Sequence, residues 1–89
     1  MKQKHYFQAI ETKFIGPTKR RGSRYCAVSA SGERIVISAD HALNSDENHS
    51  AAAHALANKL DWLSRGNRLV GGGSKNGMSF VLAGKEMFK

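Results

Sequence analysis

The side chains best suited to bind a ligand lie between residues 13 and 24, where lysine and arginine accompany the turn formers Gly16 and Pro17. Arginine presents N–H donors in a planar fork that matches the oxygens of a phosphate. Glycine in such a loop lets the backbone approach a ligand closely. The pattern predicts contacts with a phosphate backbone from five side chains: Lys13, Lys19, Arg20, Arg21 and Arg24.

Charge is distributed unevenly along the chain, whose net charge is +7. Residues 1–34 carry eight cations and two carboxylates, giving +6, and residues 65–89 carry five cations and one carboxylate, giving +4. The middle segment, 35–64, has one cation and four carboxylates, giving −3. If the two basic ends meet in one sheet, they form the surface expected of a protein that binds a polyanion. A solvated hairpin tip and an acidic protein partner remain alternatives for the basic loop.

Tyr25 and Arg34 extend the predicted interface onto the sheet. We expect both on the face that no helix covers, together with Lys13 and Val36, where an aromatic ring among cations can stack a base. A structural role for Tyr25 is the alternative, since sheets that bind bases usually present two or three aromatic rings. The segment GGGSKNG could wrap a phosphate with its backbone amides and Lys75. A mobile hairpin tip is the favoured interpretation of that segment.

Trp62 stands near the end of the predicted helix, with Arg65 and Arg68 close to it in the sequence. It either closes the edge of the core or anchors a partner protein, because Trp and Arg are enriched where interfaces bind most strongly. The two interpretations stay open at this point.

The chain shows no pattern typical of a metal or catalytic centre. The four histidines and one cysteine lack the paired spacing of zinc ligands. We expect His49 at the boundary of helix and sheet, bonded to a backbone group, and Cys26 on the core side of its strand, where a thiol is usually inert. Neither a P-loop nor a nucleophile elbow occurs. We therefore predict no enzyme activity, no cofactor and no metal.

The length of 89 residues suits one domain, 1–89. One cysteine allows no internal disulfide, which favours a cytoplasmic protein. No apolar run suits a signal peptide or a membrane span, so we expect no membrane partner. The chain is expected to be a monomer or a small homo-oligomer.

Hydrophobic periodicity predicts an α+β fold with element order βββαβ(β). The sheet is antiparallel, has four to five strands and packs one helix on one face. The capping sequence from Asn44 to Glu47 starts the helix, and Gly66 is the expected end. The helix should bury one stripe of side chains: His49, Ala52, Ala53, Leu56, Leu60 and Leu63. The expected strands are 5–15, 23–30, 34–38, 67–71 and 78–83.

The chain resembles a group of small uncharacterised proteins of phages and other mobile elements. The likeness rests on a Gly-Pro-Thr turn, a Gly-Ser-Arg step and an Asn-His-x-x-Ala-Ala helix that ends near a Trp, over about residues 11–82. It implies an accessory role in such an element, including inhibition of a host defence. The residues on which the resemblance places this role are Gly16, Pro17, Arg21, Gly22, Ser23, Arg24, Asn48 and His49. Asn48 and His49 could instead hold the first helical turn against the sheet.

These observations together predict a non-enzymatic nucleic-acid-binding accessory protein of a phage or mobile element. The first alternative is a small inhibitor that binds a host complex, for example a CRISPR defence system, through the basic loop and the Trp62 region. A further alternative is a protein that covers its bare sheet face by self-association.

Overall fold

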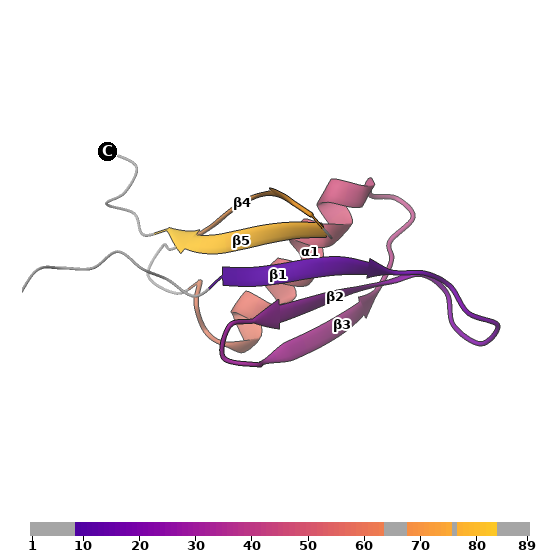
Figure 1. Ribbon diagram of the computed structural model, residues 1–89, viewed down its shortest axis with the longest axis horizontal. Helices are drawn as coiled ribbons and strands as arrows, with labels where there is room; N and C mark the ends of the chain where they lie inside the picture. The colour runs from indigo at the N-terminus through magenta and orange to yellow at the C-terminus, as the bar shows by residue number, and fades with distance from the viewer. Residues whose placement is uncertain (1–8, 64–67, 76, 84–89) are drawn as a thin grey trace, which may run out of the picture.

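The computed structural model describes residues 9–63, 68–75 and 77–83. One antiparallel sheet of five strands, in the order β3-β2-β1-β5-β4, packs one face against a single helix, α1 (Figure 1). This is the predicted α+β fold. The elements are β1 Ala9–Ile15, β2 Arg24–Ser29, β3 Arg34–Ser38, α1 Ser45–Lys59, β4 Arg68–Ser74 and β5 Gly77–Ala83.

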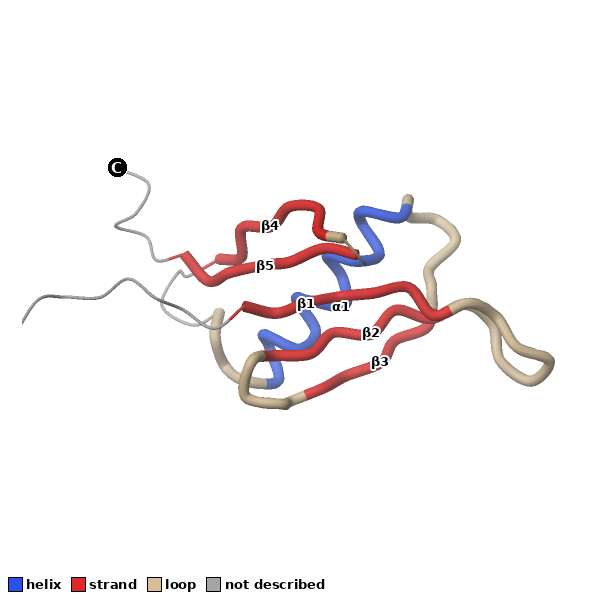
Figure 2. Tube along the Cα trace, viewed as in Figure 1, coloured by secondary structure: helices blue, strands red, loops and turns tan. Residues whose placement is uncertain are grey.

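The connection through α1 brings the two basic ends of the chain into one sheet. β1 pairs with β2 on one side and with β5 on the other, both antiparallel. The meander β1-β2-β3 therefore gains the hairpin β4-β5 at its free edge, and α1 lies behind the middle of the sheet (Figure 2), where it packs mainly on β2 and β1. Strands from both basic segments lie side by side as a consequence.

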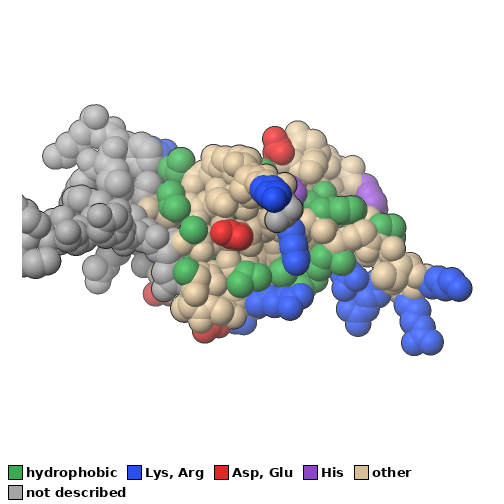
Figure 3. All heavy atoms as spheres, in the orientation of Figure 1, with side chains coloured by type: hydrophobic (Ala, Val, Ile, Leu, Met, Phe, Trp, Pro, Cys, Tyr) green, Lys and Arg blue, Asp and Glu red, His purple; other side chains and the backbone are tan. Residues whose placement is uncertain are grey.

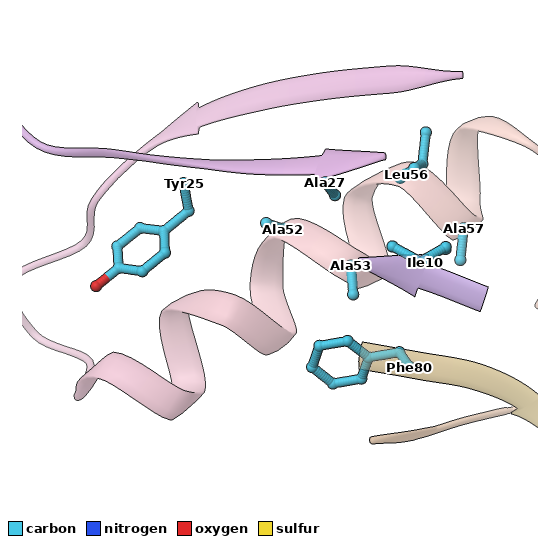
Figure 4. Close-up of a cluster of buried hydrophobic side chains, with 8 residues drawn as sticks. All are labelled: Ile10, Tyr25, Ala27, Ala52, Ala53, Leu56, Ala57 and Phe80. Carbon is cyan, nitrogen blue, oxygen red and sulfur yellow. The ribbon is translucent and has the colours of Figure 1, made fainter. Parts of the chain in front are cut away.

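The core is a thin layer between the sheet and an alanine-rich surface of α1 (Figure 4). Ala52, Ala53 and Ala57 are fully buried, and their small side chains let the helix approach the sheet closely. The predicted helical stripe is confirmed, with Leu60 and Leu63 packing at the margin. The buried apolar cluster is Ile10, Tyr25, Ala27, Ala52, Ala53, Leu56, Ala57 and Phe80.

Hydrogen bonds fix the start of α1 as the sequence indicates. Asn44 and Glu47 form the capping box, in which each side chain accepts from the other residue's backbone N–H, at 2.8 and 2.9 Å. Buried Asn48 accepts from the Asp40 N–H at 2.8 Å and donates to the Asp40 and Leu43 carbonyls. The segment between β3 and α1 is thereby tied to the first helical turn.

The predicted end of the helix is wrong. α1 ends at Lys59 and is followed by Asp61 in the left-handed region, with φ 59°. Gly66, the expected cap, lies outside the described residues, as does the part of the first expected strand before Ala9.

The predicted orientation of β2 is also wrong. Tyr25 faces the helix and is only 6% exposed, whereas Cys26 faces the other side of the sheet. Both alternating sets of β2 side chains are largely apolar, so the pattern did not decide which set faces the core. The alanine surface of α1 decides it, because it leaves room for the large Tyr25 ring.

The glycine-rich segment is a strand rather than a mobile tip. Gly71, Gly72 and Gly73 lie within β4, each opposite a residue of β5. Gly71 pairs with Phe80, and a Cβ at Gly71 would overlap the Phe80 ring. Glycine is therefore required at that position because the ring lies over its backbone.

Candidate nucleic-acid interface

The face of the sheet away from α1, here called the open face, presents its side chains in rows across the strands. Residues directly opposite on neighbouring strands point to the same face, so the registers define the rows. From the end nearest the β1–β2 loop, the rows are Ile15–Arg24–Ser38, then Lys13–Cys26–Val36, then Gly72–Ser79–Glu11–Val28–Arg34. Each of these rows carries one cation, and Glu11 is the one carboxylate among the described strand residues.

Figure 3 shows this face, where lysine and arginine side chains form a band from the middle of the sheet to the projecting loop. Lys13 and Arg34 are exposed there, as predicted, and Arg24 is half-buried. Arg68 begins β4 at the far edge of the same face and is exposed. Cations from both basic segments, Lys13 and Arg34 from the first and Arg68 from the last, therefore lie on one face of the sheet.

The β1–β2 loop extends beyond the sheet (Figure 2) and is organised by Thr18. The Thr18 N–H donates to the Arg21 carbonyl at 2.7 Å, and the Thr18 hydroxyl accepts from the Arg21 and Arg20 N–H groups at 3.1 and 3.3 Å. These bonds close a tight turn that leaves Lys19, Arg20 and Arg21 exposed. The loop can therefore bring three cations to a ligand with part of its conformational entropy already lost.

A cavity of about 400 Å³ lies on the open face between the predicted phosphate contacts Lys13 and Lys75. Lys75 belongs to the turn between β4 and β5. The other residues that line this cavity include Glu11, Cys26 and Val28. Cys26 is 1% exposed although none of the described elements covers this face, which indicates that its short side chain lies below those of its neighbours. Its expected packing role is retained, but on the face opposite the one predicted.

Trp62 packs against the core, which is the first of its two predicted roles. Its backbone N–H donates to the Ala57 carbonyl at 2.9 Å, so the chain folds back on the end of α1. Arg65, predicted beside it, lies outside the described residues.

Thr12 and His49 are buried polar residues on the helix side of the sheet. Thr12 and His49 are hydrogen-bonded through Oγ1 and Nδ1 at 2.7 Å, and the Thr12 hydroxyl also donates to the Met78 carbonyl at 3.3 Å. The Tyr25 ring meets the His49 ring edge to face, with 4.8 Å between centroids. The predicted backbone partner of His49 is thus replaced by the Thr12 hydroxyl. Sequence reasoning missed Thr12, whose only signal was its place among the apolar positions of β1.

Burial lowers the pKa of His49 because a charged ring is poorly solvated there, and the nearby Asp46 carboxylate partly opposes this effect.

Two residues of the resemblance, Asn48 and His49, have a structural role, because their hydrogen bonds hold α1 to the neighbouring chain segments. The loop residues of the same resemblance, including Arg21 and Arg24, instead line a surface cavity.

Within the described ranges, no three His, Cys, Asp or Glu side chains gather as metal ligands do. Among the same residues no helix is both long enough and apolar enough to cross a membrane.

Comparison with protein-family models, curated proteins and solved structures gave no match to this chain. Its function is therefore argued from its own surface.

Proposed function

We propose that this chain is a non-enzymatic nucleic-acid-binding protein whose loop and open face contact phosphates. The observation that carries the proposal is the gathering of cations on one side of the sheet. Lys13, Arg24 and Arg34 lie in successive rows, and the loop extends the band with Lys19, Arg20 and Arg21. Cations that follow one another across the sheet and along the loop can contact the regularly spaced phosphates of a nucleic-acid backbone.

The charges on the helix side of the domain also favour binding of a polyanion to the open face. α1 carries Asp46 and Glu47 in its first turn, and Asp61 follows its end, with Lys59 as the one cation of the helix. A polyanion is therefore attracted to the open face and repelled from the helix layer. Phosphate contacts position a ligand without selecting a base sequence, so we expect binding with little sequence preference.

The accessory role in a phage or mobile element is part of this proposal and rests on the resemblance of the loop and helix motifs. Binding without catalysis suits such a role, because a small domain can act by occupying a nucleic acid.

The test is binding of labelled single- and double-stranded DNA and RNA over a salt series. The variant Lys19→Ala/Arg20→Ala/Arg34→Ala removes cations from both the loop and the sheet, and Lys59→Ala on α1 is the control. We expect affinity to fall steeply with salt, and the triple variant to lower the slope by about one unit for each lost contact. The control should keep the slope of the unaltered protein.

Failure of the unaltered protein to bind any of the four nucleic acids at low salt would overturn the proposal. Equal losses in the triple variant and in Lys59→Ala would overturn the assignment to the open face, because the helix cation lies on the other side.

A second function, inhibition of a host protein complex such as a CRISPR system, is favoured by one observation. Phe14 is 50% exposed at the root of the basic loop, where its ring meets Tyr25 edge to face at 5.3 Å. An exposed aromatic beside cations is a suitable protein anchor, and a better placed one than Trp62. In a plaque assay on a CRISPR-active host, this function predicts restored plaques that Phe14→Ser abolishes without changing oligonucleotide affinity.

A further inference from the structure

A second cavity, of about 340 Å³, lies at the root of the basic loop. Its walls come from the returning arm of the loop and from the end of β3. Arg24 pairs with Ser38 in the sheet, and the Ala39 N–H donates to the Ser23 carbonyl at 2.9 Å, so backbone bonds hold the two walls together. The lining residues are Arg21, Gly22, Ser23, Arg24, Ser38, Ala39 and His41.

The chemistry of this cavity suits an anion. Its lining includes two arginines, two serines and one histidine, and no Asp or Glu belongs to its described lining. Asp40 is adjacent in the sequence, but its carboxylate accepts from the Ala42 N–H at 2.9 Å. Hydroxyl, imidazole and guanidinium groups can all donate to an oxyanion, and the guanidinium can do so through two parallel bonds.

One donor in this cluster lacks an acceptor. The Nε of Arg24 is shielded from water and has no hydrogen-bond partner within the described parts of the chain. A buried donor without a partner costs about 1–3 kcal/mol, so such groups usually have a ligand or a functional reason. Arginine binds a phosphate along the edge that includes Nε, so a phosphate in the cavity would supply the missing acceptor once the Arg24 side chain turns this edge toward it.

The backbone of the second arginine that lines the cavity is also held in place. The backbone of Arg21 is fixed on both sides by Thr18, through its N–H and its carbonyl. A site that is ordered before the ligand arrives loses less entropy on binding.

We infer that this cavity binds a single phosphate group, with Arg24 and Arg21 as its principal ligands and Ser23, Ser38 and His41 as additional donors. Its volume leaves room for the sugar attached to that phosphate. The source of the phosphate rests on the proposed function: either a terminal phosphomonoester or an internal phosphodiester of a nucleic acid. Within the band of cations, this cavity would therefore hold one phosphate in a defined position.

The test is a titration of the full chain with inorganic phosphate, followed by NMR of the backbone amides at constant ionic strength. We expect saturable shifts at residues 21–24 and 38–41. Arg24→Gln should weaken phosphate binding by about tenfold or more, as loss of a charge-assisted bidentate contact does. Arg34→Gln, which removes an equal charge from the same face, should change it by less than about twofold.

If Arg24→Gln loses amide dispersion and so does not fold, Arg21→Gln in the exposed loop is used instead, with the same expectation. Shifts that do not saturate, or equal effects of the cavity variant and of Arg34→Gln, would overturn the inference.

A second arm compares one short single-stranded oligonucleotide with and without a 5′-phosphate. Tighter binding of the phosphorylated form, lost in Arg24→Gln, assigns the cavity to a terminal phosphate. Equal binding of both forms, weakened in Arg24→Gln beyond Arg34→Gln, assigns it to an internal one. Saturable phosphate binding without any oligonucleotide binding would support the cavity and overturn the proposed function. Oligonucleotide binding without saturable phosphate binding would overturn the assignment of a phosphate site to the cavity and leave the proposed function standing.

Discussion

The two faces of the sheet differ in how their polar groups are satisfied. On the helix side, Thr12, Asn48 and His49 are buried and hydrogen-bonded within the protein. On the open face, the Nε of Arg24 is shielded from water and has no acceptor among the described residues, and Lys13 and Arg34 are exposed. One face completes its interactions on folding, whereas the other keeps donors available. This difference indicates which face stabilises the fold and which is available for a ligand.

The two faces also differ in packing. Apart from Phe14 at the end of β1, the helix side is closed by a layer of alanines at zero exposure, while Val36, Val70 and Val81 on the open face remain 38–45% exposed. Strand alternation separates the two sets of side chains, so substitutions on one face should not affect the other. The following predictions test that separation.

The largest expected effect is that of Leu56→Ala. Leu56 is fully buried between α1 and the sheet, and the substitution leaves a cavity that the alanines around it cannot fill. We expect the free energy of unfolding to fall by about 2–5 kcal/mol. Val36→Ala, on the open face, should lower it by less than about 1 kcal/mol. Urea denaturation followed by circular dichroism measures both, and equal losses would contradict the contrast.

Gly71→Ala should have the next largest effect. The new Cβ would overlap the Phe80 ring, so the ring or the strand must shift, at an expected loss of about 1–3 kcal/mol. Gly72→Ala is the matched control, because a Cβ at Gly72 meets no atom within 4 Å. Thermal unfolding of the two variants compares them directly. A Gly71→Ala variant as stable as the Gly72→Ala variant would show that Phe80 does not hold this position.

The stability should depend on pH through His49. Its pKa is lowered in the folded state, so the unfolded chain takes up a proton first as the pH falls below about 6.5. The free energy of unfolding should therefore decrease through the window from 6.5 down to the folded pKa, by at most about 1.4 kcal/mol per pH unit. Denaturation at several pH values should show this component in the unaltered protein.

The matched variants for the pH effect are His49→Gln and His41→Gln. The first should remove the component, while the second, at an exposed position, should retain it. Persistence of the full pH dependence in His49→Gln would assign it to other groups.

The smallest effect on stability is expected for Arg34→Gln. Arg34 is exposed on edge strand β3, and substitutions of this kind usually change stability by less than about 0.5 kcal/mol. The same variant should nevertheless weaken nucleic-acid binding and lower its salt slope by about one unit. A large loss of stability would show that the open face also maintains the fold.

Much of the fold was predictable because its local signals agree. The capping box at Asn44, the helical stripe through Leu56 and the strand 34–38 each follow from a short sequence pattern. The β4–β5 hairpin was also expected, but its strands extend through the glycines to Ser74. A glycine run has no preference visible in the sequence, and the pairing with β5 decides its conformation.

The candidate site was predictable in its cations and not in its geometry. Lys13 and Arg34 lie on the expected face, whereas Tyr25 does not, so the predicted stacking platform is absent from the described open face. Arg24, predicted as a loop contact, lies on the open face because β2 has the orientation opposite to the predicted one. His41 and Ser38 carried no sequence signal as ligand residues. They join Arg24 only because the end of β3 returns beside the loop.

The sequence by itself determined the order of the elements, the helix start, the buried stripe of α1 and the two basic segments, because these depend on the spacing and type of nearby residues. Only the tertiary structure decided which side of β2 faces the core, that both basic segments share one sheet face, and that a phosphate-sized cavity lies under the loop. These features depend on contacts between residues far apart in the chain, such as Thr12 with His49 and Gly71 with Phe80. These contacts form where packing excludes water and satisfies buried polar groups, and no local sequence pattern specifies that arrangement.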